Sequence, residues 1–236
     1  MTASEKKVLF VLVEGISDMI SLKYSFESAF PDKRVMVEAY KGDITTQRSV
    51  NASNIEERIY EEMWHRLRQT SLDFDDVCEI IHIIDTDAAY IEDKRVIQEE
   101  SRQHPFYDSD KCVIRTRNKF GIEKRNEQKR EVVDCLVECD DLFGIPYRVF
   151  YMSCNLDHVL HDNPNTCQDM KTRKSKQFAL RYKDDLAGFI RFMTESPFSD
   201  AGEYHKSWDR LRFDDAGKNS IRQATNLGIV FEDAPQ

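Results

Sequence analysis

Two stretches decide the fold: KVLFVLVEGISD at residues 7–18 and IIHIIDTD at residues 80–87. Each begins as an apolar, partly β-branched run and ends abruptly in carboxylates, a pattern typical of a buried parallel strand. Open α/β sheets bind ligands beyond the carboxyl ends of their strands, so these acids are the first candidates for a site. If the two strands are neighbours, Glu14, Asp85 and Asp87 meet at one edge of the sheet.

The surrounding segments alternate between strands and helices. Strands are predicted over 7–13, 35–40, 79–85 and 145–152, and helices over about 18–29, 55–67 and 126–142. We expect Ser17 to cap the first helix and Ser53-Asn54-Ile55-Glu56 to form a capping box for the second. The alternation predicts an α/β fold with a mostly parallel sheet of about four strands flanked by helices.

The rest of the chain suggests a core domain and an extension. Charged residues from about 92 to 125 surround one short apolar run at 112–114, which indicates a long insertion with little core. Further helices are predicted over 168–194 and 204–225. We therefore expect an α/β domain over 1–165 and a helical C-terminal extension over 166–236 that packs on it.

The composition is that of a globular protein. Hydrophobic residues make up 40% and charged residues 33% of the 236 positions, and no apolar run approaches the roughly 20 residues that cross a bilayer. The six cysteines are scattered without a CxxC pair or a secretory signal, so we expect free thiols in a cytoplasmic protein. The net charge of −9 disfavours indiscriminate wrapping of nucleic acid and still permits a local basic surface.

The acids at the strand ends are arranged as a metal site requires. Alternate residues of an extended chain point the same way, so Asp85 and Asp87 can share one face. A neighbouring strand lies about 4.8 Å away, which brings Glu14 within reach. Carboxylates this close repel one another unless a cation compensates their charge. Mg²⁺ suits this need because it binds a few carboxylate oxygens and keeps positions for water and phosphate.

These motifs resemble the Toprim family, the metal-dependent catalytic domain of topoisomerases, bacterial primases, OLD-type nucleases and small maturation ribonucleases. The family carries Glu-Gly after its first strand and Asp-x-Asp after its third, matched here by Glu14-Gly15 and Asp85-Thr86-Asp87. Gly42 stands where the family often has a glycine-containing turn, and the spacing from Glu14 to Asp18 is most similar to the nuclease branch. The resemblance covers roughly residues 6–90 and the strand at 145–152.

The resemblance implies a Toprim-like Rossmannoid core that cleaves DNA or RNA phosphodiester bonds with Mg²⁺ or Mn²⁺. By this analogy Asp85 and Asp87 hold the metal, Asp18 helps with a second ion, and Glu14 is a ligand or general base. Asp157 stands where OLD-type nucleases carry another acid. Such nucleases often work beside an ATPase, fused or separate, in bacterial defence against phage, so a separate ATPase partner is expected.

Two basic clusters are candidates for binding the phosphate backbone of nucleic acid. They comprise Lys111, Arg115, Arg117, Lys119, Lys124, Arg125, Lys129 and Arg130 in one stretch, and Lys171, Arg173, Lys174 and Lys176 in another. The interspersed acids Glu123, Glu127 and Asp169 fit an ordinary solvated face equally well.

Other interpretations of these residues remain open. A Toprim-like module without activity would bind nucleic acid or a protein partner and leave it uncut. A phosphatase of the haloacid-dehalogenase type would use Asp85 as its nucleophile, although that family places its Asp-x-Asp after the first strand. His158 and His161 have a spacing that suits Zn²⁺ on a helix. Cys135 and Cys139 share a helix face, where buried cysteines are usually small apolar groups.

Overall fold

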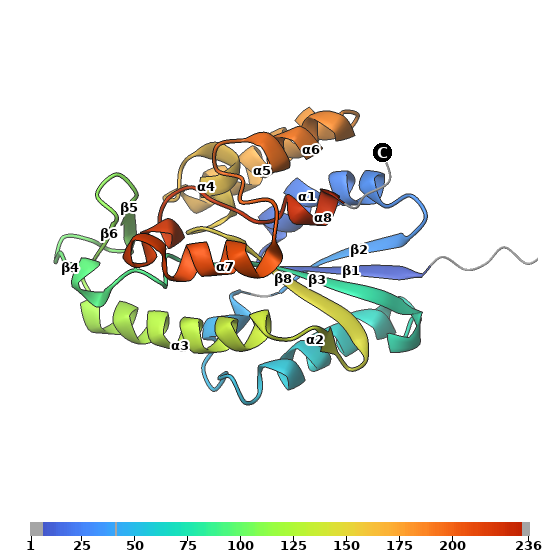
Figure 1. The fold of residues 1–236 in the computed structure, drawn as a ribbon, viewed down its shortest axis with the longest axis horizontal. Helices are drawn as coiled ribbons and strands as arrows, with labels where there is room; N and C mark the ends of the chain where they lie inside the picture. Colours follow the sequence, from blue (N-terminus) through green and yellow to red (C-terminus); the bar gives the residue numbers. More distant parts are fainter. Residues whose placement is uncertain (1–6, 41, 233–236) are drawn as a thin grey trace, which may run out of the picture.

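The computed structural model describes residues 7–40 and 42–232. The first six residues of the domain predicted over 1–165, and Lys41 within it, lie outside the described residues. The same holds for the last four residues of the extension predicted over 166–236. In the described part, helices enclose a central sheet (Figure 1).

The central sheet has five strands (Figure 1). Their bounds are Val8–Val13 for β1, Arg34–Ala39 for β2, Val77–Asp85 for β3, Asp141–Leu142 for β7 and Ile145–Met152 for β8. The strand order is β2–β1–β3–β8–β7. All pairings among β2, β1, β3 and β8 are parallel, whereas β7 is antiparallel to β8. The predicted α/β class is confirmed, and the sheet is mixed.

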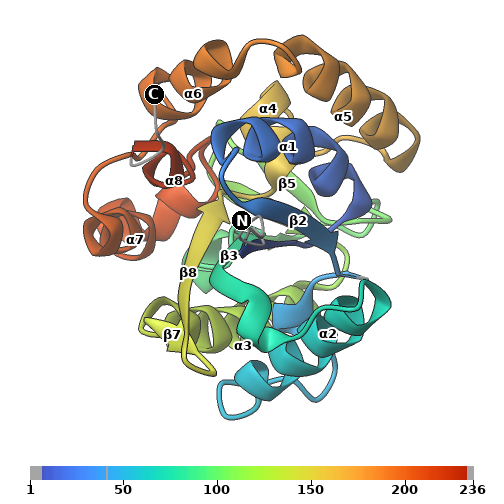
Figure 2. The ribbon, with the colours of Figure 1, turned by 90° about the vertical axis from the view of Figure 1, so that its right-hand side faces the viewer.

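Helices cover both faces of this sheet (Figures 1 and 2). One face carries α1 (Ile16–Ala29), α4 (Leu156–His161), α5 (Gln168–Tyr182), α6 (Leu186–Glu195) and α8 (Ile229–Glu232). The opposite face carries α2 (Ile55–Gln69) and α3 (Lys119–Val137). The remaining α-helix of the described chain, α7 (Tyr204–Arg212), contacts β8 through the Trp208 indole, which donates to the Val149 carbonyl at 3.3 Å.

The apolar run of β1 is unbroken because the strand is buried on both faces. Alternate side chains of a strand point to opposite faces, so a strand covered on both sides needs apolar residues throughout. Phe10 and Leu12 pack into the core beneath α2 and α3. Leu9 and Val11 pack into the core beneath α1 and α5. The first polar position after this run is Glu14, where the chain leaves the sheet.

The charged segment from 92 to 125 is folded, so the prediction of little core there is wrong. It contains β4 (Val96–Gln98), β5 (Phe106–Asp108) and β6 (Val113–Thr116), which form a second sheet in the order β4–β6–β5. Val96, Tyr107 and Ile114 share a small core with Ile91 and Ile221. These strands are only three or four residues long, too short for a recognisable alternation.

The predicted caps of the first two helices are wrong. Gly15 is the N-cap of α1, and its backbone NH donates to Asp18 Oδ2 at 2.9 Å, so Ser17 lies within the first turn. The Ser53 hydroxyl donates to Asn51 Oδ1 at 2.6 Å instead of capping α2. Asp18 therefore has a structural function at the start of α1.

Later helix boundaries also differ from the prediction. α3 begins at Lys119, earlier than expected, because Asn118 Oδ1 accepts the Gly121 NH at 3.0 Å and caps the helix there. It ends at Val137, also earlier than expected. The helix predicted over 168–194 is divided into α5 and α6 by Asp185, which caps α6. The helix predicted over 204–225 ends at Arg212, shortly before three consecutive residues with positive φ.

The six cysteines are all free thiols, as predicted. Cys112 and Cys154 are buried, whereas Cys167 is exposed. Among the described residues, no helix has the combined length and apolar character needed to cross a membrane.

Candidate active site at the carboxyl edge of the sheet

The ends of β1 and β3 bring Glu14 and Asp85 together. These strands are adjacent and parallel, and Glu14 Oε1 accepts the backbone NH of Asp85 at 3.0 Å. β3 ends at Asp85, and Asp87 adopts a left-handed backbone with φ of 50°. The prediction that Asp87 continues the extended strand is therefore wrong. Asp87 reaches the same edge through a turn in which its NH donates to the Cys154 carbonyl at 2.8 Å.

A buried lysine lies among the acids. Lys129 Nζ is 2.7 Å from Asp87 Oδ2, 2.9 Å from Asp43 Oδ2 and 3.7 Å from Glu14 Oε1. Its side chain is 0% exposed, so the prediction that Lys129 binds a phosphate backbone is wrong. The ammonium instead neutralises carboxylates that come from three separate segments of the chain.

Asp43 is a member of this centre that the sequence analysis missed. It caps the 3₁₀ helix η1 (Ile44–Thr46), accepting the backbone NH of Thr45 at 2.8 Å and the Thr46 hydroxyl at 2.6 Å. Burial alone would raise its pKa, but the charge of Lys129 and these hydrogen bonds bring the pKa of Asp43 to about 2. The Asp-x-Thr-Thr pattern was the available signal, because it is typical of a capped turn.

A second lysine lies beside the other predicted acids. Lys171 Nζ, on α5, is 3.4 Å from Asp157 Oδ2. Its positive charge also acts on Asp18 and Asp85, opposing the rise in pKa that burial causes in each. Asp85 Oδ1 accepts the Leu156 NH at 3.0 Å, which places the start of α4 against the end of β3. Asp18 and Asp157 thus lie close to the centre.

Negative charge exceeds positive charge at this edge. Six carboxylates face three cationic groups, an excess of three: Glu14, Asp18, Asp43, Asp85, Asp87 and Asp157 against Arg125, Lys129 and Lys171. Burial, followed by repulsion from Asp43, raises the pKa of Glu14 well above its usual range. Burial and repulsion from Asp18 do the same to the pKa of Asp85. Lys129 and Arg125 overcome burial at Asp87, whose pKa is lowered.

The donor chemistry of this edge fits a hard divalent cation. Glu14 and Asp85 offer carboxylate oxygens, the ligands of Mg²⁺ and Mn²⁺, and neighbouring acids add to the rise in pKa that burial causes in each. In the described part of the chain, the acids do not present three ligand atoms within 4.8 Å of one another. Lys129 is instead the cation around which Glu14, Asp43 and Asp87 gather.

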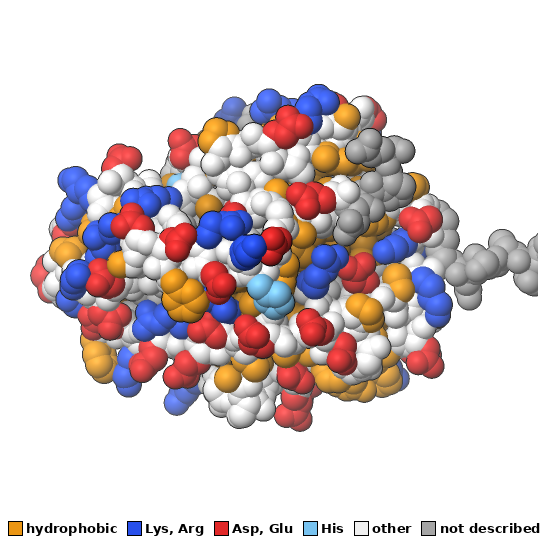
Figure 3. Space-filling view, in the orientation of Figure 1, with side chains coloured by type: hydrophobic (Ala, Val, Ile, Leu, Met, Phe, Trp, Pro, Cys, Tyr) orange, Lys and Arg blue, Asp and Glu red, His pale blue; other side chains and the backbone are white. Residues whose placement is uncertain are grey.

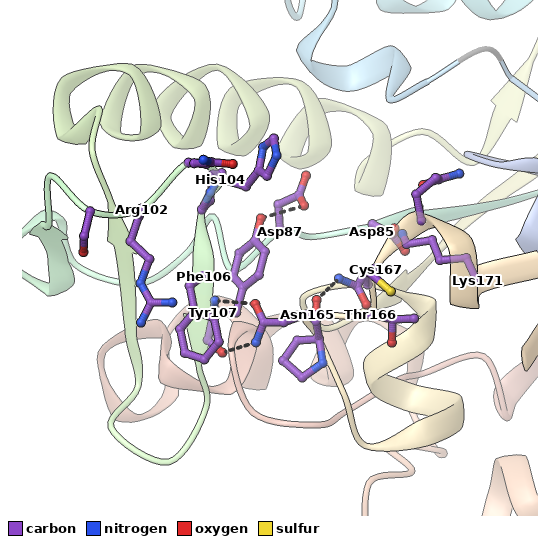
Figure 4. A pocket seen from close by; sticks show the side chains of 16 residues that line it. Asp85, Asp87, Arg102, His104, Phe106, Tyr107, Asn165, Thr166, Cys167 and Lys171 are labelled. Carbon is purple, nitrogen blue, oxygen red and sulfur yellow. Dashed lines mark hydrogen bonds between the residues drawn. The ribbon is translucent and has the colours of Figure 1, made fainter.

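A cleft of about 710 Å³ opens beside Asp85 and Asp87 (Figure 4). Residues 101–107 of the insertion line one side, and residues 164–168 with Lys171 line another. The Tyr107 hydroxyl donates to Asp87 Oδ1 at 3.0 Å, and the Asn165 amide bonds the backbone of Tyr107 at 2.8 and 2.9 Å. The insertion therefore lines the cleft and positions Asp87. Its charged sequence indicated neither role.

Three of the residues predicted to bind phosphate form hydrogen bonds or ion pairs with other residues of this protein. Arg125 donates to the Asp87 carbonyl at 2.8 Å and to the Tyr107 hydroxyl at 3.0 Å. Arg130 donates to the Ala89 carbonyl at 2.8 Å. Arg115 pairs with Asp108 at 3.3 Å. These contacts stabilise the insertion and the loop after β3.

The other predicted basic residues lie on a surface of mixed charge. On the face shown in Figure 3, Lys and Arg side chains alternate with Asp and Glu. The exposed members are Lys111, Arg117, Lys124, Arg173 and Lys176, and the half-buried ones are Lys119 and Lys174. Beside the acids, the basic side chains that line the cleft are Arg102 and Lys171. Arg102 was not among the predicted residues.

The histidine pair considered for Zn²⁺ is used in packing. His158 is buried, and the His161 ring lies 6.1 Å from that of Phe178. Burial lowers the pKa of both imidazoles. Among the described residues, neither histidine belongs to a group of three possible ligand atoms within 4.8 Å.

Known proteins give no independent identification of the site. No family model matches the chain, no curated protein matches it, and no solved structure matches it. The Toprim resemblance therefore depends on the sequence motifs, chiefly Glu14-Gly15 and Asp85-Thr86-Asp87.

Removing the Lys129 ammonium should destabilise the protein in a pH-dependent way. We expect Lys129→Met to lower the free energy of unfolding by about 3–5 kcal/mol at pH 8, because it leaves buried carboxylates without their cation. The loss should shrink at pH 4.5, where the unpaired carboxylates of the variant take up protons. The wild-type contribution of Asp43 stays nearly constant over this range, since it is lost as pH falls from the unfolded-state pKa of about 3.9 through the folded-state pKa of about 2.

Chemical denaturation at the two pH values measures this effect. Lys124→Met is the matched control, because Lys124 is an exposed lysine of the same helix. It should change the free energy of unfolding by less than about 0.5 kcal/mol. An equal loss at both pH values in Lys129→Met would contradict the assigned ion pairs.

Asp18 should make stability depend on pH in the opposite sense. Burial raises its folded-state pKa to about 6, so its ionisation opposes folding. This cost grows as pH rises from the unfolded pKa of about 3.9 to the folded value and is constant above it. We expect Asp18→Asn to raise the free energy of unfolding more at pH 8 than at pH 4, as measured by chemical denaturation. Asp209→Asn, at an exposed acid of α7, should show no such difference.

Proposed function

We propose that this protein is a Mg²⁺-dependent nuclease with a Toprim-like core that hydrolyses phosphodiester bonds of DNA or RNA. The observation that carries the proposal is the meeting of Glu14 and Asp85, joined by a 3.0 Å hydrogen bond beside an open cleft. Burial and neighbouring acids raise the pKa of both groups, and a bound Mg²⁺ or Mn²⁺ would favour their ionised forms.

Each residue of the edge has a proposed part in the reaction. Glu14 and Asp85, with Asp18 next to them, would hold the ion, which when bound polarises the phosphoryl group and acidifies a water molecule. Glu14 would also act as the general base toward a water molecule at this edge, and burial raises its pKa in the direction that favours accepting a proton. Lys129 fixes Asp87 and Glu14 by its ion pairs.

The cleft supplies the proposed contacts with substrate. Lys171 and Arg102 line it and carry positive charge toward a phosphate backbone. The face shown in Figure 3 is mixed in charge, whereas Arg102 and Lys171 supply local positive charge within the cleft. A phosphodiester placed in the cleft would lie beside Asp85 and Asp87.

A second function is favoured by the contacts of Lys129. Its ammonium lies within 3.7 Å of carboxylate oxygens from Glu14, Asp43 and Asp87, and so supplies part of the charge that a metal would provide. With that charge in place, the same fold would serve as a module that binds nucleic acid or a protein partner without cutting it.

Cleavage assays distinguish these functions. Purified protein is incubated with panels of DNA and RNA in Mg²⁺, in Mn²⁺ or in chelator. We expect metal-dependent cleavage that Glu14→Gln and Asp85→Asn each reduce at least about 100-fold, because each removes a charge used in the transition state. Glu131→Gln, an exposed acid of α3, should retain wild-type cleavage.

Other outcomes would redirect the assignment. Binding without cleavage in every condition, unchanged by Glu14→Gln and Asp85→Asn, would support the binding module. Release of phosphate from small phosphomonoesters that depends on Asp85 and not on Glu14 would indicate a phosphatase. Repeating the assay with a separate candidate ATPase added tests whether such a partner is required.

A further inference from the structure

Two cysteines and a glutamate lie together between α2 and α3. The Sγ atoms of Cys135 and Cys139 and a carboxylate oxygen of Glu56 are all within 4.8 Å of one another. No other set of three such ligand atoms in residues 7–40 and 42–232 meets this distance. Cys135 lies six residues beyond Lys129, or about 9 Å along a helix, so the cluster is separate from the acid edge.

The fold sets these side chains in place. Cys135 lies in the last turn of α3, and Cys139 follows two residues after the helix ends at Val137, where its backbone NH donates to the Leu136 carbonyl at 3.3 Å. Glu56 lies in the first turn of α2, which runs on the same side of the sheet as α3 (Figures 1 and 2). Cys139 Sγ is 3.6 Å from Glu56 Oε1, and Cys135 Sγ is 3.5 Å from the Ala52 carbonyl.

These separations suit tetrahedral coordination. Bonds of about 2.3 Å from zinc to sulfur and about 2.0 Å to oxygen put neighbouring S and O ligands about 3.5 Å apart and two sulfurs about 3.8 Å apart. The observed distance between Cys139 Sγ and Glu56 Oε1 is 3.6 Å. The sulfur-to-sulfur separation lies within the 4.8 Å limit of the cluster. Coordination therefore requires little more than rotation of side chains.

The environment favours a thiolate here only with a metal present. Burial, followed by the charge of Glu56, raises the pKa of Cys139 to about 12. A thiolate beside a carboxylate is unfavourable unless a cation lies between them. Without a metal, both cysteines are neutral side chains that pack against the core beneath α2 and α3.

We propose that Glu56, Cys135 and Cys139 bind a thiophilic divalent cation of the Zn²⁺ class that joins the start of α2 to the end of α3. Two S–H bonds are replaced by two sulfur–metal bonds, and two protons pass to solvent. Three protein ligands leave the fourth position to water, and the partial exposure of all three residues gives the ion access. The site is independent of the proposed nuclease centre.

Titration of the metal-free full chain with Co²⁺ tests the proposal. We expect one Co²⁺ per chain to give sulfur-to-cobalt charge-transfer absorption, which Zn²⁺ displaces. Cys135→Ser and Cys139→Ser should each abolish this absorption, and Glu56→Gln should weaken Co²⁺ affinity at least about tenfold. Cys78→Ser is the matched control, because Cys78 lies on β3 and its thiol donates to the Val8 carbonyl at 3.2 Å.

Further measurements separate this site from the acid edge and from misfolding. Asp85→Asn should keep the charge-transfer absorption whether or not the protein cuts nucleic acid. In the wild type, Zn²⁺ should protect Cys135 and Cys139 from alkylation, as read by peptide mass spectrometry, even if a serine variant fails to fold. Absence of the absorption at millimolar Co²⁺, or its persistence in Cys135→Ser/Cys139→Ser, would overturn the proposal.

Discussion

The ammonium of Lys129 is the contact on which the carboxyl edge of the sheet depends. It joins Glu14 after β1, Asp43 at η1 and Asp87 after β3, three segments whose carboxylates would otherwise repel one another. The neighbouring Gln128 amide fixes α3 to the same region by donating to the Val50 carbonyl at 2.9 Å. The positions of α3, the η1 turn and the loop after β3 therefore depend on one another. The buried ammonium of Lys129 fixes these segments relative to each other.

This contact divides the edge into two electrostatic halves. Asp43 and Asp87 have their charge met by Lys129, and their pKa values are lowered. Glu14 and Asp85 have pKa values raised well above the usual range, because burial and like charges outweigh the cations nearby. Asp85 of the second half lines the cleft next to Asp87 of the first half, so a further cation bound by Asp85 would lie where substrate has access.

The sequence indicated the parts of this arrangement that depend on local pattern. β1 and β3 were predicted to within two residues because both faces are buried, and their ends place Glu14 and Asp85. Lys129 was misassigned because a lysine within a charged run reads as solvated. Lys129 precedes Val132 by three residues, a spacing that places both on one face of a helix and could have indicated that Lys129 is buried. The contact of Tyr107 with Asp87 depends on the tertiary folding of the insertion. The strands of the insertion are too short to give a sequence pattern from which that folding could be predicted.

Anomalous diffraction from crystals grown with Mn²⁺ tests directly whether the second half of the edge binds a metal. We expect a peak about 2.2 Å from a carboxylate oxygen of Asp85, with Glu14 or Asp18 as a further ligand. Lys129 should remain bonded to Asp87 in the same crystals. A map with Glu14 and Asp85 well ordered and no peak beside them at saturating Mn²⁺ would contradict the proposed metal centre.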